Sequence, residues 1–89
     1  MPTKPEDKIT YYVVQSFSKA KRGVEIDQPQ EMRSELQAKR TAERLSSSKV
    51  GVIAFSRTGS PATGEWEPAV IIAQYGSVSE ELVEFLSAA

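Results

Sequence analysis

The clearest chemical signal in the sequence is a set of polar side chains that recur every three or four positions. Arg33, Gln37, Arg40 and Arg44 would form one row along the surface of an α-helix. Guanidinium groups in such a row suit phosphate oxygens or the carboxylates of an acidic protein segment. The alternative interpretation is an ordinary solvated helix face. Arg40 and Arg44 carry like charges one helical turn apart, which disfavours the helix itself and favours a binding use for the row.

Further cations lie in a connection whose composition predicts an exposed turn. If this turn folds beside the helix, its cations and the arginines form one continuous basic surface for an acidic protein or a nucleic acid. The candidate anion- or partner-binding residues are Lys19, Lys21, Arg22, Arg33, Arg40 and Arg44. No aromatic residue is interleaved with the row, which argues against stacking of single-stranded bases. The net charge of −1 also argues against a general nucleic-acid binder.

Side chains for catalysis or metal binding are scarce. The sequence has no His and no Cys, so the commonest general base and the thiolate nucleophile are absent. Residues 59–64 have the glycine spacing of a phosphate loop but lack the lysine and the helix that must follow it. Glu80, Glu81 and Glu84 suit a hard metal ion, although glutamates in this arrangement more commonly solvate a helix. We therefore predict no catalytic residue, no cofactor and no metal, and an enzyme is the least favoured class.

Length and composition indicate a small globular protein. The chain has 89 residues, of which 39% are hydrophobic and 26% are charged, as in an ordinary folded domain. We expect a flexible N-terminal tail over residues 1–8 and a single α+β domain over residues 9–87. No apolar stretch suits a signal peptide or a membrane span, so the expected location is the cytoplasm.

The arginine row must be positioned by a helix, which the composition predicts over residues 30–47. This segment lacks Gly and Pro and is rich in residues that favour helices. Ala38, Ala42 and Leu45 share the face nearly opposite the arginines, and their small size lets the helix approach a sheet closely.

Three apolar segments predict the strands of that sheet. They cover residues 9–17, 50–57 and about 66–75, and a short final helix follows through residue 86. The predicted fold is α+β with the order β-α-β-β-α, a three-stranded sheet with the long helix packed on one face. A right-handed crossover would make the first two strands parallel, with the third strand between them.

Aromatic side chains on the sheet give a second candidate surface. Tyr12 and Trp66 are the candidates for a sheet-face interaction, with Tyr11 as an alternative to Tyr12. Such an apolar surface would suit dimerisation. The competing interpretation is that these rings belong to the core.

One stretch of the chain resembles a known family. Residues 12–17, followed by a helix with Ala38, Ala42 and Leu45, resemble the opening of the SPOR peptidoglycan-binding domains. That family runs β-α-β-β-α-β, whereas no final strand is predicted before Ala89 and the glycine near the end of the first strand is missing. The whole chain is similar in style to small bacterial proteins of unknown function. Given these departures, no residue role is carried over from either resemblance.

These observations favour a small cytoplasmic protein-interaction domain that associates with itself as a homodimer or binds an acidic partner. The alternative is a nucleic-acid accessory protein that binds phosphates through the basic helix face. Homodimerisation would use a sheet face or a strand edge.

Overall fold

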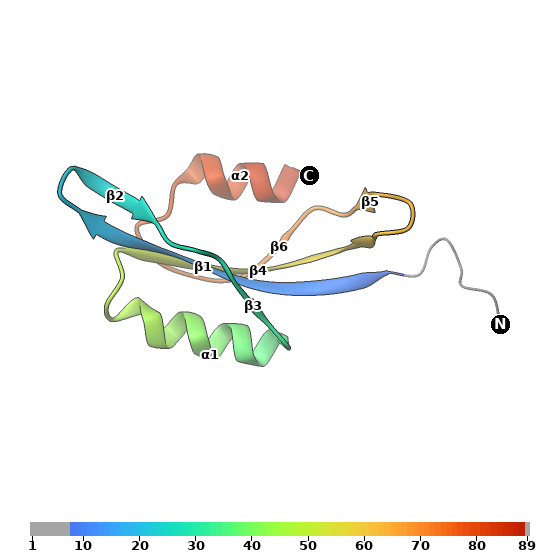
Figure 1. Ribbon diagram of the computed structural model, residues 1–89, viewed down its shortest axis with the longest axis horizontal. Coiled ribbons are helices and arrows are strands. Elements are labelled where there is room, and N and C mark those ends of the chain that lie inside the picture. The colour runs from blue at the N-terminus through green and yellow to red at the C-terminus, as the bar shows by residue number, and fades with distance from the viewer. Residues whose placement is uncertain (1–7, 89) are drawn as a thin grey trace.

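The chain folds as a curled, half-barrel sheet of six antiparallel strands with one helix on each side (Figure 1). The computed structural model describes residues 8–88, and the side chains of residues 8–84. In chain order the elements are β1 (Ile9–Ala20), β2 (Gly23–Ile26), β3 (Gln30–Met32), α1 (Glu35–Ser46), β4 (Gly51–Ser60), β5 (Glu65–Trp66), β6 (Val70–Gly76) and α2 (Glu80–Ala88). The predicted three-stranded sheet with one long helix is therefore wrong. The predicted tail lies, except for Lys8, outside the described residues.

Strand β1 organises the sheet. It has 12 residues, and the β-branched and aromatic side chains in its first part favour an extended backbone. One edge of β1 pairs with β4, from Ile9 opposite Gly59 to Phe17 opposite Gly51. The other edge pairs with the short strands β2 and β3. Strand β1 is thus hydrogen-bonded along both edges, to β2 and β3 on one side and to β4 on the other.

Strands β1 and β4 are antiparallel neighbours, which corrects the predicted parallel pair with the third strand between them. The reason is β3, which carries the chain back along β1 before α1 begins. At the end of β3 the chain therefore lies near the start of β1. The 12 residues of α1 span about 18 Å and carry the chain along the sheet to the other end of β1. Because β4 starts at that end, it must run against β1. The third predicted strand, β6, pairs on the outer side of β4.

The helix α1 is shorter than predicted. It begins at Glu35, because residues 30–32 form β3 and extend the edge of the sheet. Ser34 is the N-cap residue, and its Oγ accepts a hydrogen bond from the N–H of Gln37 at 3.1 Å. In return, Oε1 of Gln37 accepts from the N–H of Arg33 at 2.6 Å. These two contacts fix the chain at the point where β3 gives way to the helix.

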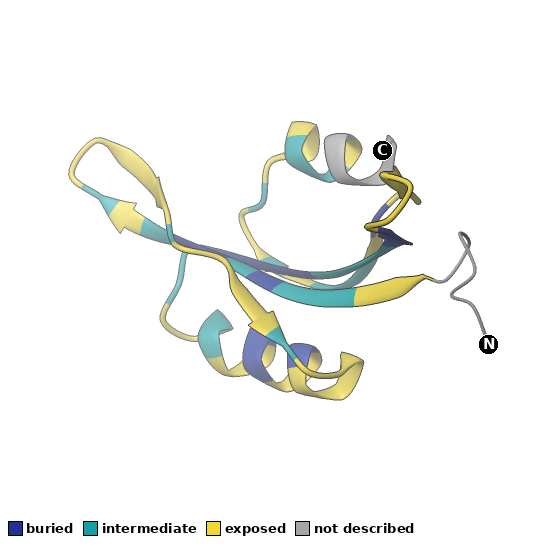
Figure 2. Ribbon diagram, turned by 45° about the vertical axis from the view of Figure 1, so that its right-hand side comes forward, coloured by how far each residue is buried: buried dark blue, intermediate teal, exposed yellow. Residues whose placement is uncertain are grey.

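Small side chains pack α1 closely against one face of the sheet. Ala38 and Ala42 are fully buried, as the helical periodicity predicts. They contact a cluster formed by Val14, Val52 and Ala54 of the two central strands. Figure 2 shows this buried part of α1 turned toward the sheet. The opposite face of α1 is therefore the one that faces solvent.

The other face of the sheet has its own core. Phe17, Ile53 and Ala69 are buried there, and Leu82 and Val83 of α2 pack against them. Figure 1 shows α2 on the side of the sheet opposite α1. The sheet therefore separates two small cores, each covered by one helix.

Candidate functional site: an arginine-lined hollow on α1

The exposed side of α1 contains an open hollow of about 460 Å³. It is lined by Arg33, Ser34, Leu36, Gln37, Arg40, Thr41 and Arg44. The structure thus brings together all three arginines of the predicted row, although Arg33 precedes the helix. Leu36 was not among the predicted site residues, and it adds an exposed apolar side chain beside the cations.

The arginines of this hollow, Arg33, Arg40 and Arg44, have no acidic partner among the described residues. They take part in none of the ion pairs found there, and all three are exposed. Lys39 differs, because its Nζ lies 3.5 Å from the carboxylate of Glu35. Each unpaired guanidinium presents a planar set of N–H donors that matches a carboxylate or phosphate group. The hollow therefore combines convergent positive charge with free hydrogen-bond donors.

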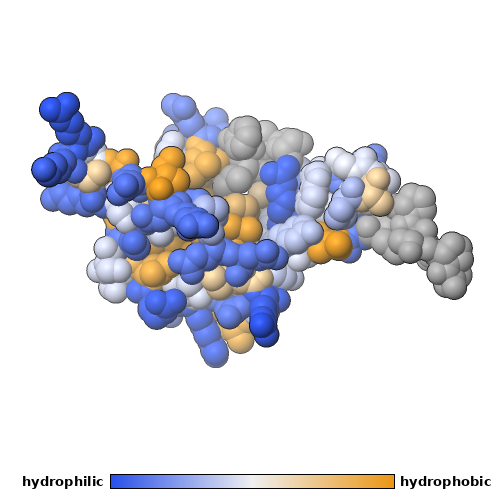
Figure 3. Space-filling view, viewed as in Figure 1, coloured by the Kyte–Doolittle hydropathy of each residue, from blue (hydrophilic) through white to orange (hydrophobic). Residues whose placement is uncertain are grey.

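The remaining predicted cations do not join this hollow. Lys19, Lys21 and Arg22 lie at the tip of the hairpin that joins β1 to β2, where Gly23 adopts a positive φ of 112°. Strand β2 contacts β1 but makes no contact with α1. In the views of Figure 1 and Figure 3 the hairpin projects at the upper left, whereas α1 lies at the bottom. The predicted cations thus form two separate groups.

The two aromatic residues predicted for one sheet surface lie on opposite faces. Tyr12 packs against the core beneath α1. Trp66 instead contacts Tyr11 on the other face, with ring centroids 5.8 Å apart and an interplanar angle of 37°. The alternation along β1 separates the neighbouring tyrosines in this way. Of the two tyrosines, Tyr11 is therefore the one that shares a surface with Trp66.

A second, largely apolar hollow of about 310 Å³ surrounds this aromatic pair. It is lined by Tyr11, Val13, Phe55, Arg57 and Trp66. The pairing of β1 with β4 creates it, because Tyr11 lies opposite Arg57 and Val13 opposite Phe55. Nε of Arg57 is enclosed and has no hydrogen-bond partner within the described part of the chain. Sequence spacing gave no sign of this site, since its residues come from segments that meet only in the sheet.

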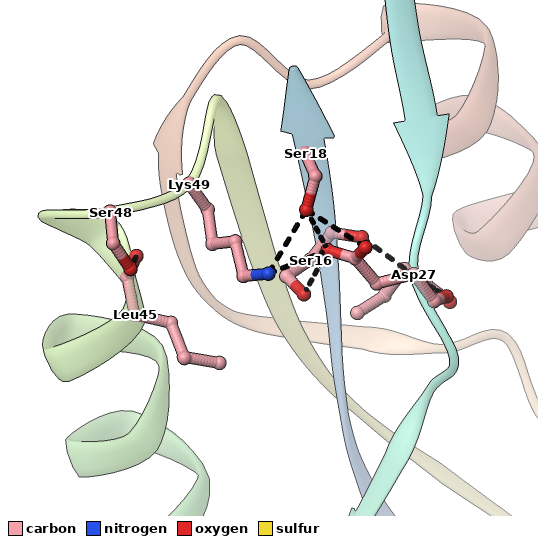
Figure 4. Close-up of polar contacts among 7 residues, drawn as sticks. Ser16, Ser18, Asp27, Leu45, Ser48 and Lys49 are labelled. Atoms are coloured by element: carbon pink, nitrogen blue, oxygen red, sulfur yellow. Dashed lines mark hydrogen bonds and ion pairs between the residues drawn. The ribbon is translucent and has the colours of Figure 1, made fainter. Parts of the chain in front are cut away.

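A cluster of polar residues lies around Asp27, near the other end of β1 (Figure 4). The hydroxyl groups of Ser16 and Ser18 donate to the Asp27 carboxylate at 2.8 Å. Lys49, in the connection between α1 and β4, approaches the same carboxylate at 3.2 Å. Its Nζ also donates to the Ser18 hydroxyl at 3.0 Å. The cluster joins three segments that are distant in sequence.

These donors stabilise the charged form of Asp27. Hydrogen bonds from Ser18 and Ser16, and then the hydrogen bond and charge of Lys49, hold the pKa of the Asp27 carboxyl below its ordinary value. Because side chains of the chain itself supply these donors, we infer that the Asp27 carboxylate has a structural role. No spacing in the sequence predicts this cluster, because Asp27 and Lys49 lie in segments that meet only in the folded chain.

Among the described residues, no group of three or more His, Cys, Asp or Glu side chains is placed to hold a metal ion. No helix in that part of the chain is long and apolar enough to cross a membrane. No protein-family model, curated protein or solved structure matches the chain. The geometry of the molecule is therefore the basis on which its function can be inferred.

Proposed function

We propose that the protein is a small interaction domain that binds an acidic segment of a partner protein through the hollow on α1. The single observation that supports this proposal most strongly is the convergence of Arg33, Arg40 and Arg44 on one open surface, where no described residue provides an acidic partner. Three unpaired like charges on one surface repel each other, and an acidic ligand would relieve that repulsion.

The lining of the hollow also indicates what else the ligand carries. Leu36 is exposed between the arginines and offers an apolar contact. A segment that alternates carboxylates with leucine-like side chains would use both features, since apolar burial and charge pairing then act together. Ser34 and Gln37 are already engaged in capping α1, so the arginines supply the main polar contacts.

A protein ligand fits the geometry better than a nucleic acid. The cations of the hairpin are separated from the hollow, so the basic surface is short. No aromatic side chain of the described residues lines the hollow, so these residues offer no surface on which an exposed base could stack. The net charge of −1 gives no long-range attraction to a polyanion.

The test is a binding titration with a fluorescent synthetic peptide that alternates glutamate and leucine. We expect the double substitution Arg33→Glu and Arg44→Glu to weaken binding about tenfold or more, since two attractive contacts become repulsive. Both residues are exposed, so the fold should persist. The matched control is Lys21→Glu with Arg22→Glu, which changes the net charge equally at the distant hairpin and should leave binding unchanged.

The same proteins are then titrated with a single-stranded and a duplex oligonucleotide at several salt concentrations. Binding of the oligonucleotides but not of the peptide, with a steep loss as salt rises, would establish the alternative nucleic-acid function instead. Equal binding of the peptide by the wild type and both double variants would also contradict the proposal, because the charge of the hollow would then be irrelevant.

A further inference from the structure

The outer edge of β6 is an open edge of the sheet. Among the described residues, β6 pairs with β4 on one side only. Its seven residues, Val-Ile-Ile-Ala-Gln-Tyr-Gly, include no charged residue and no proline. Proteins usually protect an exposed edge strand with such residues, because unpaired N–H and C=O groups attract other strands. The edge of β6 lacks charged residues and proline. A register shift against β4 interrupts it between Ile71 and Ala73, whereas residues 73–76 pair regularly with β4.

The register shows which backbone groups of β6 face outward. The N–H of Ser77 donates to the carbonyl of Val50 at 3.0 Å, directly beside the pair Gly51–Gly76. In an antiparallel pair the hydrogen-bonded positions alternate, so Tyr75 also bonds inward to Val52. The N–H and C=O of Gln74 must then point away from β4, toward the open edge.

A groove follows this edge where β6 meets α1. Its volume is about 330 Å³, and it is lined by Leu36, Lys39, Arg40, Glu43, Ile72, Ala73 and Tyr75. Apolar side chains from the strand and the helix form one part of the lining, and charged residues of α1 form the other. The combination of an apolar centre with a charged border is typical of protein–protein interfaces.

We propose that this edge pairs with β6 of a second copy of the chain, forming a two-fold symmetric dimer with a continuous sheet. A two-fold interface brings each patch against itself, so the patch must be self-complementary. The border of the groove meets this condition, because Lys39 and Arg40 are cationic while Glu43 is anionic. In the antiparallel arrangement, Glu43 of one copy faces the cations of the other. The groove adjoins the arginine-lined hollow and shares Leu36 and Arg40 with it, but Glu43 lines the groove alone and would repel a purely acidic ligand.

The backbone geometry allows a direct test with Gln74→Pro. Proline removes the outward N–H of residue 74 but no hydrogen bond between β6 and β4, and proline is tolerated on edge strands. The matched control is Gln74→Ala, which keeps the N–H. By sedimentation velocity over a range of concentrations, we expect the wild type and Gln74→Ala to dimerise. Gln74→Pro should remain monomeric with an unchanged circular dichroism spectrum.

A charge exchange provides a second test that does not depend on proline. Glu43→Lys makes the border wholly cationic in both copies and should weaken dimerisation about tenfold or more. Adding Lys39→Glu restores charges of both signs, so the double variant should dimerise again. Arg33→Glu with Arg44→Glu lies outside the groove and should leave dimerisation intact, which separates this proposal from the binding function of the hollow.

Two results would overturn the dimer. One is a wild-type protein that stays monomeric up to about 1 mM, where even weak specific association is detectable. The other is a dimer that persists equally in Gln74→Pro and Glu43→Lys, which would place the interface elsewhere on the molecule.

Discussion

Two lysine–carboxylate pairs lie toward opposite ends of the sheet, and they differ in their surroundings. Lys49 lies 3.2 Å from Asp27, and the two side chains are only 28% and 24% exposed. Lys8 pairs with Glu67 at the other end, where the side chains are 49% and 50% exposed. The first carboxylate also accepts hydrogen bonds from two serine hydroxyls. Among the described residues the second has Lys8 as its only side-chain partner.

From this difference we expect the pair at Asp27 to stabilise the fold more than the pair at Lys8. At the Asp27 end, partly buried donors surround the carboxylate and water screens it less. At the Lys8 end, water competes for both charges and the pair contributes little. Arg57 lies near this second end with Nε enclosed and unpartnered in the described part of the chain. Polar contacts are therefore concentrated at the Asp27 end, while the contact of Tyr11 with Trp66 and a hydrogen bond between Thr10 and Thr58 lie at the other.

The largest effect is expected from Asp27→Ala. The substitution removes the common acceptor of Ser16, Ser18 and Lys49. The hydroxyl of Ser16, whose residue is only 3% exposed, is then left without its acceptor, and such a loss costs about 1–3 kcal/mol. Urea denaturation should show a clear fall in the free energy of unfolding. Glu67→Ala is the control, and an equally large loss there would contradict the comparison between the two ends.

The contribution of Asp27 should also depend on pH. Its pKa is lower in the folded protein than in the unfolded chain, so its stabilisation is present above the unfolded pKa of about 4. It is lost progressively as the pH falls through the folded pKa. The difference in unfolding free energy between the wild type and Asp27→Asn should therefore be constant near neutrality and shrink below about pH 4. A difference that stays constant to pH 2 would show that Asp27 is not the group that titrates.

A smaller effect of opposite sign is expected from Arg57→Met. Methionine keeps an unbranched apolar chain against Trp66 and Tyr11 but removes the enclosed N–H that has no partner. Removing an unsatisfied buried donor should leave stability unchanged or raise it by up to about 1 kcal/mol. Urea denaturation of the variant measures this. A fall in stability would show that the guanidinium has a stabilising role at this end of the sheet.

Burial also decides which elements of the fold could be predicted from the sequence. Ala38 and Ala42 were correctly predicted to face the sheet, because burial imposes a helical period on residue type. Strands β2 and β3 expose nearly all of their residues, so burial imposes no alternation on them. They are strands because their backbones are hydrogen-bonded to β1, and the hydropathy of their residues gives no sign of these hydrogen bonds. Missing β3 led directly to the wrong direction for β4.

The candidate surfaces were predictable to the extent that they lie on one element. The arginine row follows a helical period, and two of its three arginines lie on α1. The capping signal of Ser34 with Gln37 was present in the sequence and marks the true start of the helix. The hollow around Arg57 and the cluster around Asp27 depend on strand pairing and on contacts between distant segments. Neither site produces a regular spacing of residues that could be recognised in the sequence.

The smallest effect is expected from Lys8→Met, which tests the weaker pair directly. The hydrogen bond and the charge of Glu67 raise the pKa of Lys8, so any stabilisation is fully present below the unfolded pKa and is lost as the pH rises through the folded pKa. Because both side chains are half exposed, we expect no measurable change in the unfolding free energy at neutral pH. Lys49→Met, measured beside it, should be destabilising, since it removes a donor from the partly buried Asp27 carboxylate. Equal effects of the two substitutions would mean that burial and the serine hydroxyls do not distinguish the two ends of the sheet.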